Sequence, residues 1–207
     1  MKNSQSDFAV TLSYFDISAS RGEACRMALH LAGVDFHDDR IKGSDWPDKK
    51  SSTPFGAMPV LTLKGKGELA QSNAILGFIG AGHDLLPADN FEAARHVAIL
   101  NAVEEFISRL FAGGSQDEAA KKQKREEFAA GYMKDWANNI SAQISGPFVG
   151  GDKISVADLT LYVNMNMLKS GNVDHIAADY FDAYPKLVEL YAAVHDHPGI
   201  VAYQGRA

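Results

Sequence analysis

Four hydroxyl groups lie close together between residues 12 and 29, in the stretch LSYFDISASRGEACRMAL. They belong to Ser13, Tyr14, Ser18 and Ser20. The stretch predicts the end of a strand, a loop of small residues and the start of a helix, and polar groups at such junctions often contact ligands. Each hydroxyl is therefore a candidate for donating a hydrogen bond to a substrate.

A second candidate lies in STPFGAMPVL, where Met58 precedes Pro59 at the start of a predicted strand. If the peptide bond between them is cis, the N–H and C=O of Met58 turn outward and can pair with an extended peptide ligand. A trans proline that opens a strand is the commoner arrangement, since only about 5–6% of X–Pro bonds in folded proteins are cis. The pattern alone therefore favours the trans bond.

Two further pairs of residues have the chemistry to bind carboxylates. Gln71 and Ser72, in AQSNAI, end a strand and open a helix, where backbone amides and the helix dipole favour anions. Trp46 and Lys50, in DWPDKK, bring an indole donor and an ammonium group to one loop. Each pair also has a purely structural interpretation. Ser72 can be an ordinary N-cap, and Lys50 an exposed lysine beside a half-packed tryptophan.

The elements that must position these residues follow from the hydrophobic pattern. It predicts a strand over 8–15, a helix over 20–31, a strand over 34–41, a polar loop through GSDWPDKKSS, strands over 58–63 and 68–70 joined by KGKG, and a helix over 71–80. Ser20 and Glu23 have the spacing of a capping box, and Gly33 suits a left-handed C-terminal cap. Ser13 points to the opposite strand face from Tyr14. A βαβ unit followed by an antiparallel hairpin predicts a mixed four-stranded sheet covered by helices.

From Phe91 onward the sequence predicts only helices, after a candidate linker over residues 83–90. SQDE at Ser115 and SVAD at Ser155 have the pattern of capping boxes that open new helices. The predicted fold class is therefore a small α/β domain followed by an all-α domain.

Composition excludes several classes of function. The 207-residue chain is 46% hydrophobic, enough for a sizeable core, and its net charge of −6 argues against nucleic acid as the main partner. Its one cysteine, Cys25, cannot form an intrachain disulfide and is interpreted as a buried apolar residue. His195 and His197 lack a third ligand at suitable spacing, so no metal site is predicted. No signal-peptide core or membrane-spanning run stands out, which favours the cytoplasm and no membrane partner.

Taken together, TLSYF…RGEACR, DWPDKKSSTPFGAMPVL and LAQSNAI resemble the cytosolic glutathione transferases. The resemblance is closest to the tyrosine-type classes, and within them to the sigma class, which includes glutathione-dependent prostaglandin D synthases. It covers nearly the whole chain. It implies a thioredoxin-like domain of order β-α-β-α-β-β-α over 1–82, the linker over 83–90, and a helical bundle domain over 91–207 that carries SVADLTLY and contributes an electrophile pocket.

The resemblance gives the weak candidates a common ligand, glutathione, as co-substrate. It implies that Pro59 is cis and that the backbone of Met58 pairs with the cysteinyl part of glutathione. Gln71 and Ser72 would hold the γ-glutamyl end. This division suits the ligand, because glutathione is a short extended peptide with a carboxylate at each end.

The glycine carboxylate of glutathione would lie against Trp46 and Lys50. Relatives often carry lysine or glutamine at the position of Ala57, so the alanine predicts weaker glutathione binding. Arg21 matches an arginine that supports the thiol site in sigma-like members of the family.

The resemblance also selects among the hydroxyls. Tyr14 ends the first strand, where the family's tyrosine lies, and its phenol is a stronger donor than an aliphatic hydroxyl. Ser18 is the rival, because other classes use a serine just after this strand. The stretch DISASRG is one residue longer than the sigma pattern, which can alter how Arg21 reaches the thiol. The resemblance implies that Tyr14 stabilises the glutathione thiolate.

Partners follow from the resemblance as well. It implies a homodimer, in which an acidic residue on the first helix of the helical domain, Glu104 or Glu105, reaches the glutathione of the partner subunit. The second substrate would be a hydrophobic electrophile, contacted by Phe15, Ile17 and Arg109. The alternatives are a specialised prostaglandin isomerase and a non-catalytic ligand-binding or structural protein on the same scaffold.

Overall fold

The computed structural model describes residues 9–112 and 117–205, which pack as two units. The first unit consists of residues 9–86 and 198–205, and the second of residues 87–112 and 117–197. The predicted helical domain, 91–207, differs from this division at its C-terminal end. The last helix belongs to the first unit, because it packs against the helix that follows the first strand.

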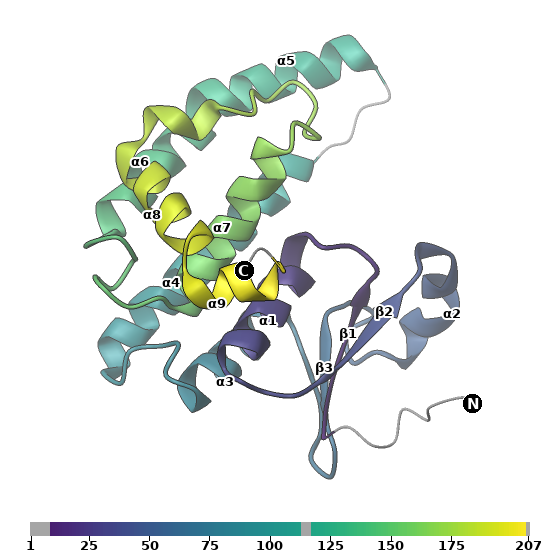
Figure 1. Ribbon diagram of the computed structural model, residues 1–207. Helices are drawn as coiled ribbons and strands as arrows, with labels where there is room; N and C mark the ends of the chain where they lie inside the picture. Colours follow the sequence, from purple (N-terminus) through teal and green to yellow (C-terminus); the bar gives the residue numbers. More distant parts are fainter. Residues whose placement is uncertain (1–8, 113–116, 206–207) are drawn as a thin grey trace. The chain divides into compact units, whose positions relative to one another are not determined.

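A four-stranded mixed sheet forms the centre of the first unit (Figure 1). Its strands are β1 (Val10–Phe15), β2 (His37–Ile41), β3 (Val60–Leu63) and β4 (Gly67–Ala70), in the order β2-β1-β3-β4. β1 pairs parallel with β2 and antiparallel with β3, and β3 pairs antiparallel with β4. The predicted mixed sheet is confirmed.

Side chains of β1 alternate between the two faces of the sheet, as strand geometry requires. Leu12 and Tyr14 are buried on one face. Ser13 lies on the other face and donates a hydrogen bond to Asp39 Oδ2 at 2.9 Å. Its hydroxyl is therefore engaged with β2 and is directed away from Tyr14, as predicted.

The helices of the described first unit are α1 (Ser20–Leu31), α2 (Trp46–Lys49), α3 (Ser72–Gly82) and α9 (Pro198–Tyr203). α1 and α3 lie side by side on one side of the sheet, and α2 lies on the other (Figure 1). α9 packs along α1, where the ring of Tyr203 lies 5.3 Å from that of His30. α2 is the helix that the family order implies between the second and third strands, where the hydrophobic pattern alone predicts a loop.

The C-terminal end of α1 follows its sequence. Gly33 has φ +64, and the N–H groups of Gly33 and Val34 bond to the carbonyls of His30 and Leu29. These two bonds satisfy the last carbonyls of the helix in a Schellman motif. The left-handed cap predicted for Gly33 is confirmed.

The N-terminal end of α1 does not follow its sequence, and the predicted capping box of Ser20 and Glu23 is wrong. The cap position is Ala19, which has no side-chain acceptor. Ser20 has φ +62, in the left-handed region, whereas an N-cap residue is extended. Glu23 is buried and bonds to Arg26 and Tyr203. The physical reason is tertiary: a buried network uses the carboxylate that the helix would otherwise use.

The described part of the second unit is built from helices. They are α4 (Asn90–Phe111), α5 (Glu118–Phe128), the π-helical turn η3 (Ala129–Met133), α6 (Lys134–Gln143), α7 (Val156–Lys169), the short 3₁₀ turn η4 (Tyr180–Ala183) and α8 (Pro185–His195). The capping box at Ser155 is confirmed, since its N–H and hydroxyl bond to Asp158 Oδ2 at 2.8 and 2.6 Å. Ser115 lies outside the described residues, and α5 begins after Asp117, whose carboxylate caps the first turn. Among the described helices, none has the length and apolar character needed to cross a membrane.

Candidate functional site

The strand directions bring four chain junctions to one edge of the sheet. β1 and β2 run parallel, so Phe15 pairs with Ile41 where both strands end. β3 begins at this edge with Val60 opposite Ser13, and β4 ends there with Ala70 opposite Val60. The segments after β1, after β2, before β3 and after β4 therefore share this edge. These segments and the last residues of β1 carry Tyr14, Trp46, Lys50, Met58, Pro59, Gln71 and Ser72.

Tyr14 is held by close packing against the start of α1. Its side chain is 4% exposed. A Cβ on Gly22 would lie 2.1 Å from Tyr14 Cδ1, so only glycine lets the helix approach the ring this closely. Among the described residues no group hydrogen-bonds to the Tyr14 hydroxyl, and that oxygen is not one of the buried polar atoms that lack a partner. The ring is therefore fixed while the hydroxyl remains accessible.

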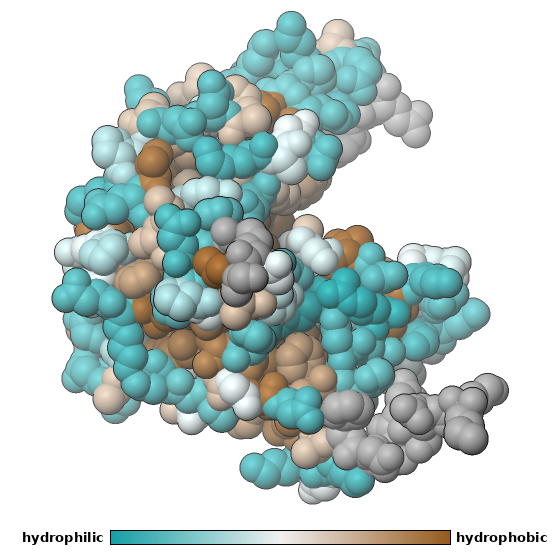
Figure 2. Space-filling view, in the orientation of Figure 1, coloured by the Kyte–Doolittle hydropathy of each residue, from teal (hydrophilic) through white to brown (hydrophobic). Residues whose placement is uncertain are grey.

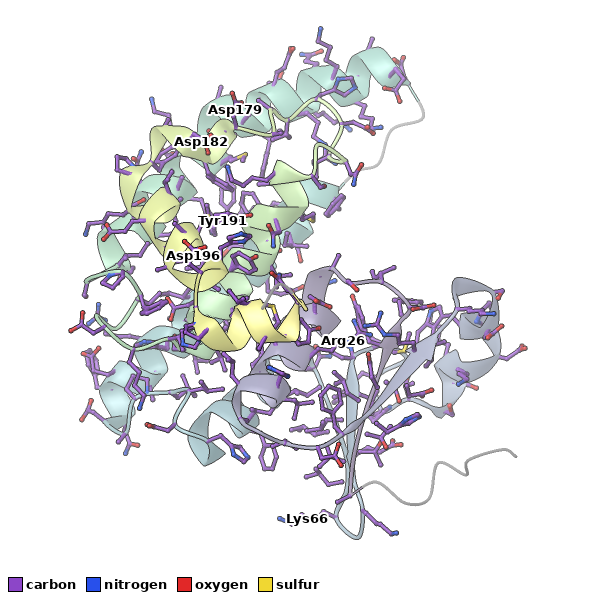
Figure 3. All side chains as sticks on the ribbon, viewed as in Figure 1. Arg26, Lys66, Asp179, Asp182, Tyr191 and Asp196 are labelled. Atoms are coloured by element: carbon purple, nitrogen blue, oxygen red, sulfur yellow. The ribbon has the colours of Figure 1, made fainter. Side chains whose placement is uncertain are left out.

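The loop that follows β1 is fastened by a buried arginine that the motifs did not single out. Arg26 is 1% exposed and donates to the carbonyl oxygens of Phe15 at 3.1 Å and Ile17 at 2.7 Å. Its Nε donates to Asp38 Oδ1 at 2.8 Å, and Figure 3 shows Arg26 where α1 lies beside the strands. The available signal was an acid and a base three residues apart, Glu23 and Arg26, among the apolar residues of α1. Such a pair on a core-facing helix indicates a buried network.

The Met58–Pro59 peptide bond is cis, the arrangement that the family resemblance implies and the pattern alone does not favour. Pro59 is buried and Met58 is half-buried. In the described part of the chain, neither the N–H nor the C=O of Met58 has a hydrogen-bond partner. Both groups are therefore available to an extended peptide.

The segment after β2 holds Trp46 and Lys50 at the same edge. Trp46 is half-buried, begins α2, and meets the ring of Phe15 edge to face at 5.7 Å. Lys50 is exposed, and a Cβ on Gly56 would lie 3.7 Å from Lys50 Cε, so the next loop folds back along this lysine. Ala57 is exposed and offers no polar side chain. An indole N–H and an ammonium group thus share one surface loop.

Gln71 and Ser72 form the junction between β4 and α3. Gln71 is exposed, has φ +72 and occupies the cap position of α3. Ser72 is 8% exposed and is the first residue of the helix, so the interpretation of Ser72 as the N-cap is wrong. No side chain caps the helix at this position, and its first amides favour an anion.

Three further predicted residues lie in the loop between β1 and α1 or at the start of α1. Ile17 is 45% exposed, Ser18 is exposed, and Arg21 is half-buried as the second residue of α1. The exposed hydroxyl of Ser18 leaves it as the rival donor to Tyr14.

Glu105 and Arg109 lie one turn apart on α4, in the second unit. Arg109 Nη2 lies 2.7 Å from Glu105 Oε1, and both side chains are about half exposed, at 56% and 55%. The Arg109 guanidinium stacks 4.4 Å from the ring centre of Tyr132. Burial raises the pKa of Tyr132, and the charge of Glu105 raises it further. The structure therefore brings these two predicted residues together, with Glu105 engaged inside its own chain; Glu104 is the half-buried residue before it.

Cys25 and the histidine pair offer no separate chemistry. Burial raises the pKa of Cys25 to about 12, so its thiol stays protonated and unreactive near neutral pH. His195 Nδ1 lies 3.0 Å from the hydroxyl of Tyr162. Within residues 9–112 and 117–205, no group of three or more His, Cys, Asp or Glu side chains is placed to hold a metal ion.

Comparison with known proteins decides the family. Residues 10–81 match the family model described as the glutathione S-transferase N-terminal domain, and residues 102–206 match the glutathione S-transferase C-terminal domain. A curated relative, the probable glutathione S-transferase 7 of Caenorhabditis elegans, is 30% identical over 201 residues, which cover 91% of this chain and 92% of that protein. The chain belongs to the glutathione S-transferase family.

Two other similar proteins indicate how this glutathione S-transferase scaffold is used. S-crystallin 4 of Enteroctopus dofleini is 26% identical over 210 residues, covering 93% of this chain and 94% of that protein. The solved structure of prostaglandin synthase D of Nilaparvata lugens superimposes with a TM-score of 0.83 at 28% identity, covering 96% of this chain and 98% of that one. The comparisons confirm the predicted family, the two-part fold, and glutathione transfer with glutathione as co-substrate.

Proposed function

We propose that this protein transfers glutathione to hydrophobic electrophiles and that the Tyr14 hydroxyl stabilises the glutathione thiolate. The observation that carries the proposal is the Tyr14 side chain, whose ring is buried and whose hydroxyl has no partner among the described residues. It lies at the sheet edge where the backbone of Met58 also has no hydrogen-bond partner within the described ranges. A glutathione molecule paired with Met58 presents its cysteine at the end of β1.

Stabilising the glutathione thiolate requires a moderate free energy. A free thiol has a pKa of about 8.5, and lowering it by ~2 units requires about 2.7 kcal/mol of preferential stabilisation of the thiolate. A hydrogen bond to a charged group contributes about 1.5–3 kcal/mol, and it costs little reorganisation when the donor is already in place. The N-terminal amides of α1 and the nearby Arg21 add to this stabilisation. The thiolate sulfur then forms a bond to the electrophilic carbon.

The ends of glutathione are assigned to two anion-binding positions. Gln71 and Ser72 take the γ-glutamyl end, because the amides at the start of α3 favour a carboxylate. Trp46 and Lys50 take the glycine carboxylate with an indole N–H and a positive charge. Ala57 adds no polar contact, so binding at the glycine end rests on Trp46 and Lys50 alone.

The finer assignments are part of the same proposal. The enzyme is placed in the sigma class, in the cytoplasm, and as a homodimer in which Glu105 reaches the glutathione of the partner subunit. That role requires Glu105 to leave its salt bridge with Arg109. Phe15 and Ile17, in the loop after Tyr14, offer apolar surface to the electrophile, and Arg109 stays a predicted contact of the second substrate.

Two alternative functions are supported by relatives. The similarity to a prostaglandin synthase favours prostaglandin isomerisation, which uses the same thiolate on a narrower substrate. The similarity to an S-crystallin favours a structural protein that retains the scaffold. Activity towards a general electrophile separates the crystallin-like alternative from both enzymatic ones, and turnover of a prostaglandin endoperoxide separates the two enzymes.

The test is glutathione conjugation to chlorodinitrobenzene by the wild-type protein, Tyr14→Phe and Ser18→Ala. Tyr14→Phe is expected to lower kcat/KM roughly ten- to a hundredfold and to raise the pKa of the bound thiol by ~2 units. Ser18→Ala is expected to match the wild type. The thiol pKa is read from the ultraviolet absorbance of the thiolate in the binary complex as pH is raised.

A loss confined to Ser18→Ala would transfer the donor role to the serine and overturn the tyrosine-type assignment. A wild-type protein that binds glutathione without conjugating it would support the structural alternative.

A further inference from the structure

The C-terminal helix is connected to the start of α1 by one hydrogen bond. The Tyr203 hydroxyl, on α9, donates to Glu23 Oε1 at 2.9 Å. Burial raises the pKa of Tyr203, and the charge of Glu23 raises it further, so the hydroxyl keeps its proton and acts as a donor. α9 packs on α1 within the same unit, and Figure 1 shows the two helices side by side.

Glu23 also contacts Arg26. Its carboxylate is buried, and Oε2 lies 3.4 Å from Arg26 Nη1. The same nitrogen donates to the carbonyl of Ile17, and Nη2 donates to the carbonyl of Phe15. A continuous set of polar contacts therefore runs from α9 to two carbonyl groups, those of Phe15 and Ile17, in the segment that follows Tyr14.

The outer side of the loop is held by a second arginine. Arg40 donates to Asp38 Oδ2 at 2.7 Å and approaches Asp16 Oδ1 at 3.4 Å, while Asp38 also accepts from Arg26. The N–H of Asp16 bonds to the carbonyl of Ile41 at 3.0 Å. Figure 2 shows hydrophilic residues over the part of the surface where Figure 1 draws the ends of β1 and β2. Loop residues 15–17 are thus bonded from α1 on one side and from β2 on the other.

We infer that Arg26 and Tyr203 are positioning residues for Tyr14, so that the C-terminal helix sets how well the Tyr14 hydroxyl stabilises the glutathione thiolate. The inference rests on the proposed function of Tyr14. Neither residue touches the thiol. Arg26 fixes the carbonyl of Phe15, the residue after Tyr14, and its guanidinium lies 5.8 Å from the centre of the Tyr14 ring.

The physical reason is the steep dependence of a charge-assisted hydrogen bond on geometry. Without the Tyr203 hydroxyl, Glu23 loses a donor and is free to turn, and Arg26 loses the carboxylate that holds its Nη1 edge. The loop then samples more positions, and the Tyr14 donor is less well placed for the sulfur. Stabilisation of the thiolate falls, so the pKa of the bound thiol rises.

The test variant is Tyr203→Phe, which removes one oxygen atom and keeps the ring that packs on His30. Its matched control is Tyr191→Phe, which removes a tyrosine hydroxyl that donates to a side-chain oxygen, Asn166 Oδ1, at 2.6 Å in the second unit (Figure 3 labels Tyr191). Both are compared with the wild type and Tyr14→Phe in the full chain. The readouts are the pKa of bound glutathione, kcat and KM for conjugation, and the thermal midpoint.

Tyr203→Phe is expected to raise the pKa of the bound thiol by about half a unit and to lower kcat below that pKa about threefold. The KM for glutathione should stay within about twofold of the wild type, because Met58, Gln71 and Ser72 are untouched. Tyr191→Phe should change only the thermal midpoint. A purely structural role for Tyr203 would give the control's result: a lower midpoint and an unchanged thiol pKa.

Combining Tyr203→Phe with Glu23→Gln tests the route. If Tyr203 acts through Glu23, the pKa change in the double variant is smaller than the sum of the two single changes. Additive changes would overturn the route through Glu23.

The wild type and Tyr14→Phe separate this inference from the proposed function. If the wild type does not lower the thiol pKa, or Tyr14→Phe leaves it low, the proposed function fails and the inference falls with it. If those two behave as proposed while Tyr203→Phe matches Tyr191→Phe, only the inference fails.

Discussion

Two helices of this protein open on the same sequence signature and build different first turns. α7 follows Ser155 and has Asp158 three residues later, and α1 begins at Ser20 with Glu23 three residues later. At α7 the box closes, with Ser155 and Asp158 bonded to each other. At α1 Ser20 has φ +62, and Glu23 bonds instead to Arg26. One signature serves a local cap in the second unit and a long-range network in the first.

The free energies of a helix cap and of a buried ion pair explain why Glu23 joins the network while Asp158 closes the capping box. A helix N-cap contributes about 1 kcal/mol. A buried arginine that loses its carboxylate partner costs about 3–5 kcal/mol. Arg26 is 1% exposed and its guanidinium is shared by Glu23 and Asp38, so the buried Glu23 carboxylate, which also accepts from Tyr203, serves this network in preference to the local cap of α1. In α7 the acidic residue serves its own helix and also accepts the N–H of Val149, so the local motif and the tertiary contact agree.

The largest expected effect tests the α7 side of this comparison. Asp158→Ala leaves three buried donors without an acceptor: the N–H of Val149, and the N–H and hydroxyl of Ser155. Burial raises the pKa of Asp158, whereas the hydrogen bonds from Ser155 and Val149 act in the opposite direction and favour the carboxylate. The substitution is expected to lower the free energy of unfolding of the second unit by about 3–5 kcal/mol. Urea unfolding followed by tryptophan fluorescence measures it, because Trp136 lies in this unit.

Asp117→Ala is the matched control, since Asp117 caps α5 through two amides at an exposed position. It is expected to cost about 1 kcal/mol. Equal losses for the two variants would mean that the box at α7 is only a helix cap.

A second prediction concerns the close approach at the start of α1. Gly22→Ala would place a methyl group 2.1 and 2.2 Å from Cδ1 and Cγ of Tyr14, so the ring or the helix must move. We expect a loss of about 1–3 kcal/mol in unfolding free energy. Since the Tyr14 hydroxyl moves with its ring, the pKa of bound glutathione should rise as well. Denaturation and the thiolate titration measure the two effects.

Gly77→Ala, in the interior of α3, is the control, because nothing lies within 4 Å of a Cβ there. It should be neutral or stabilising by up to about 1 kcal/mol, from helix propensity. A tolerated alanine at Gly22 with an unchanged thiol pKa would show that the contact with Tyr14 does not position the hydroxyl.

Local patterns predicted the parts of the fold whose causes are local. The parallel pairing of β1 with β2 follows from the βαβ unit, the antiparallel pairing of β3 with β4 follows from the hairpin, and the cap at Gly33 follows from the left-handed conformation that glycine adopts without strain. The sheet edge that gathers Tyr14 and Met58 follows from the predicted strand directions. No local rule favoured the cis bond before Pro59, because its cause lies outside its own sequence neighbourhood.

The contacts that the pattern could not predict join distant segments. Tyr203 and Glu23 are 180 residues apart, and no spacing rule connects them. The motifs did not single out Arg26, and its burial depends on how α1 packs. Long-range polar contacts of this kind decide the conformation of the loop after β1, which is why the site is harder to predict than the sheet that carries it.

The smallest expected changes in stability come from substitutions of the two serines, Ser155 and Ser20. Ser155→Ala removes the hydroxyl from a closed capping box and is expected to cost about 1 kcal/mol. Ser20→Ala removes a hydroxyl that is not at a cap position and should change stability by less than about 0.5 kcal/mol. Ser20→Gly should be stabilising by up to about 1 kcal/mol, because glycine adopts φ +62 without a steric penalty.

Glycine substitutions at Ser20 and Ser155 are expected to change stability in opposite directions. Ser155 has φ −136 and ψ 171, an extended conformation that any residue adopts, so Ser155→Gly gains nothing from the freedom of glycine and should only weaken α7.

 Thermal unfolding of Ser20→Gly and Ser155→Gly therefore should shift the midpoint in opposite directions, upward for the first and downward for the second. Shifts of the same sign would mean that Ser20 caps α1 in solution, and the contrast between the two helix starts would then be lost.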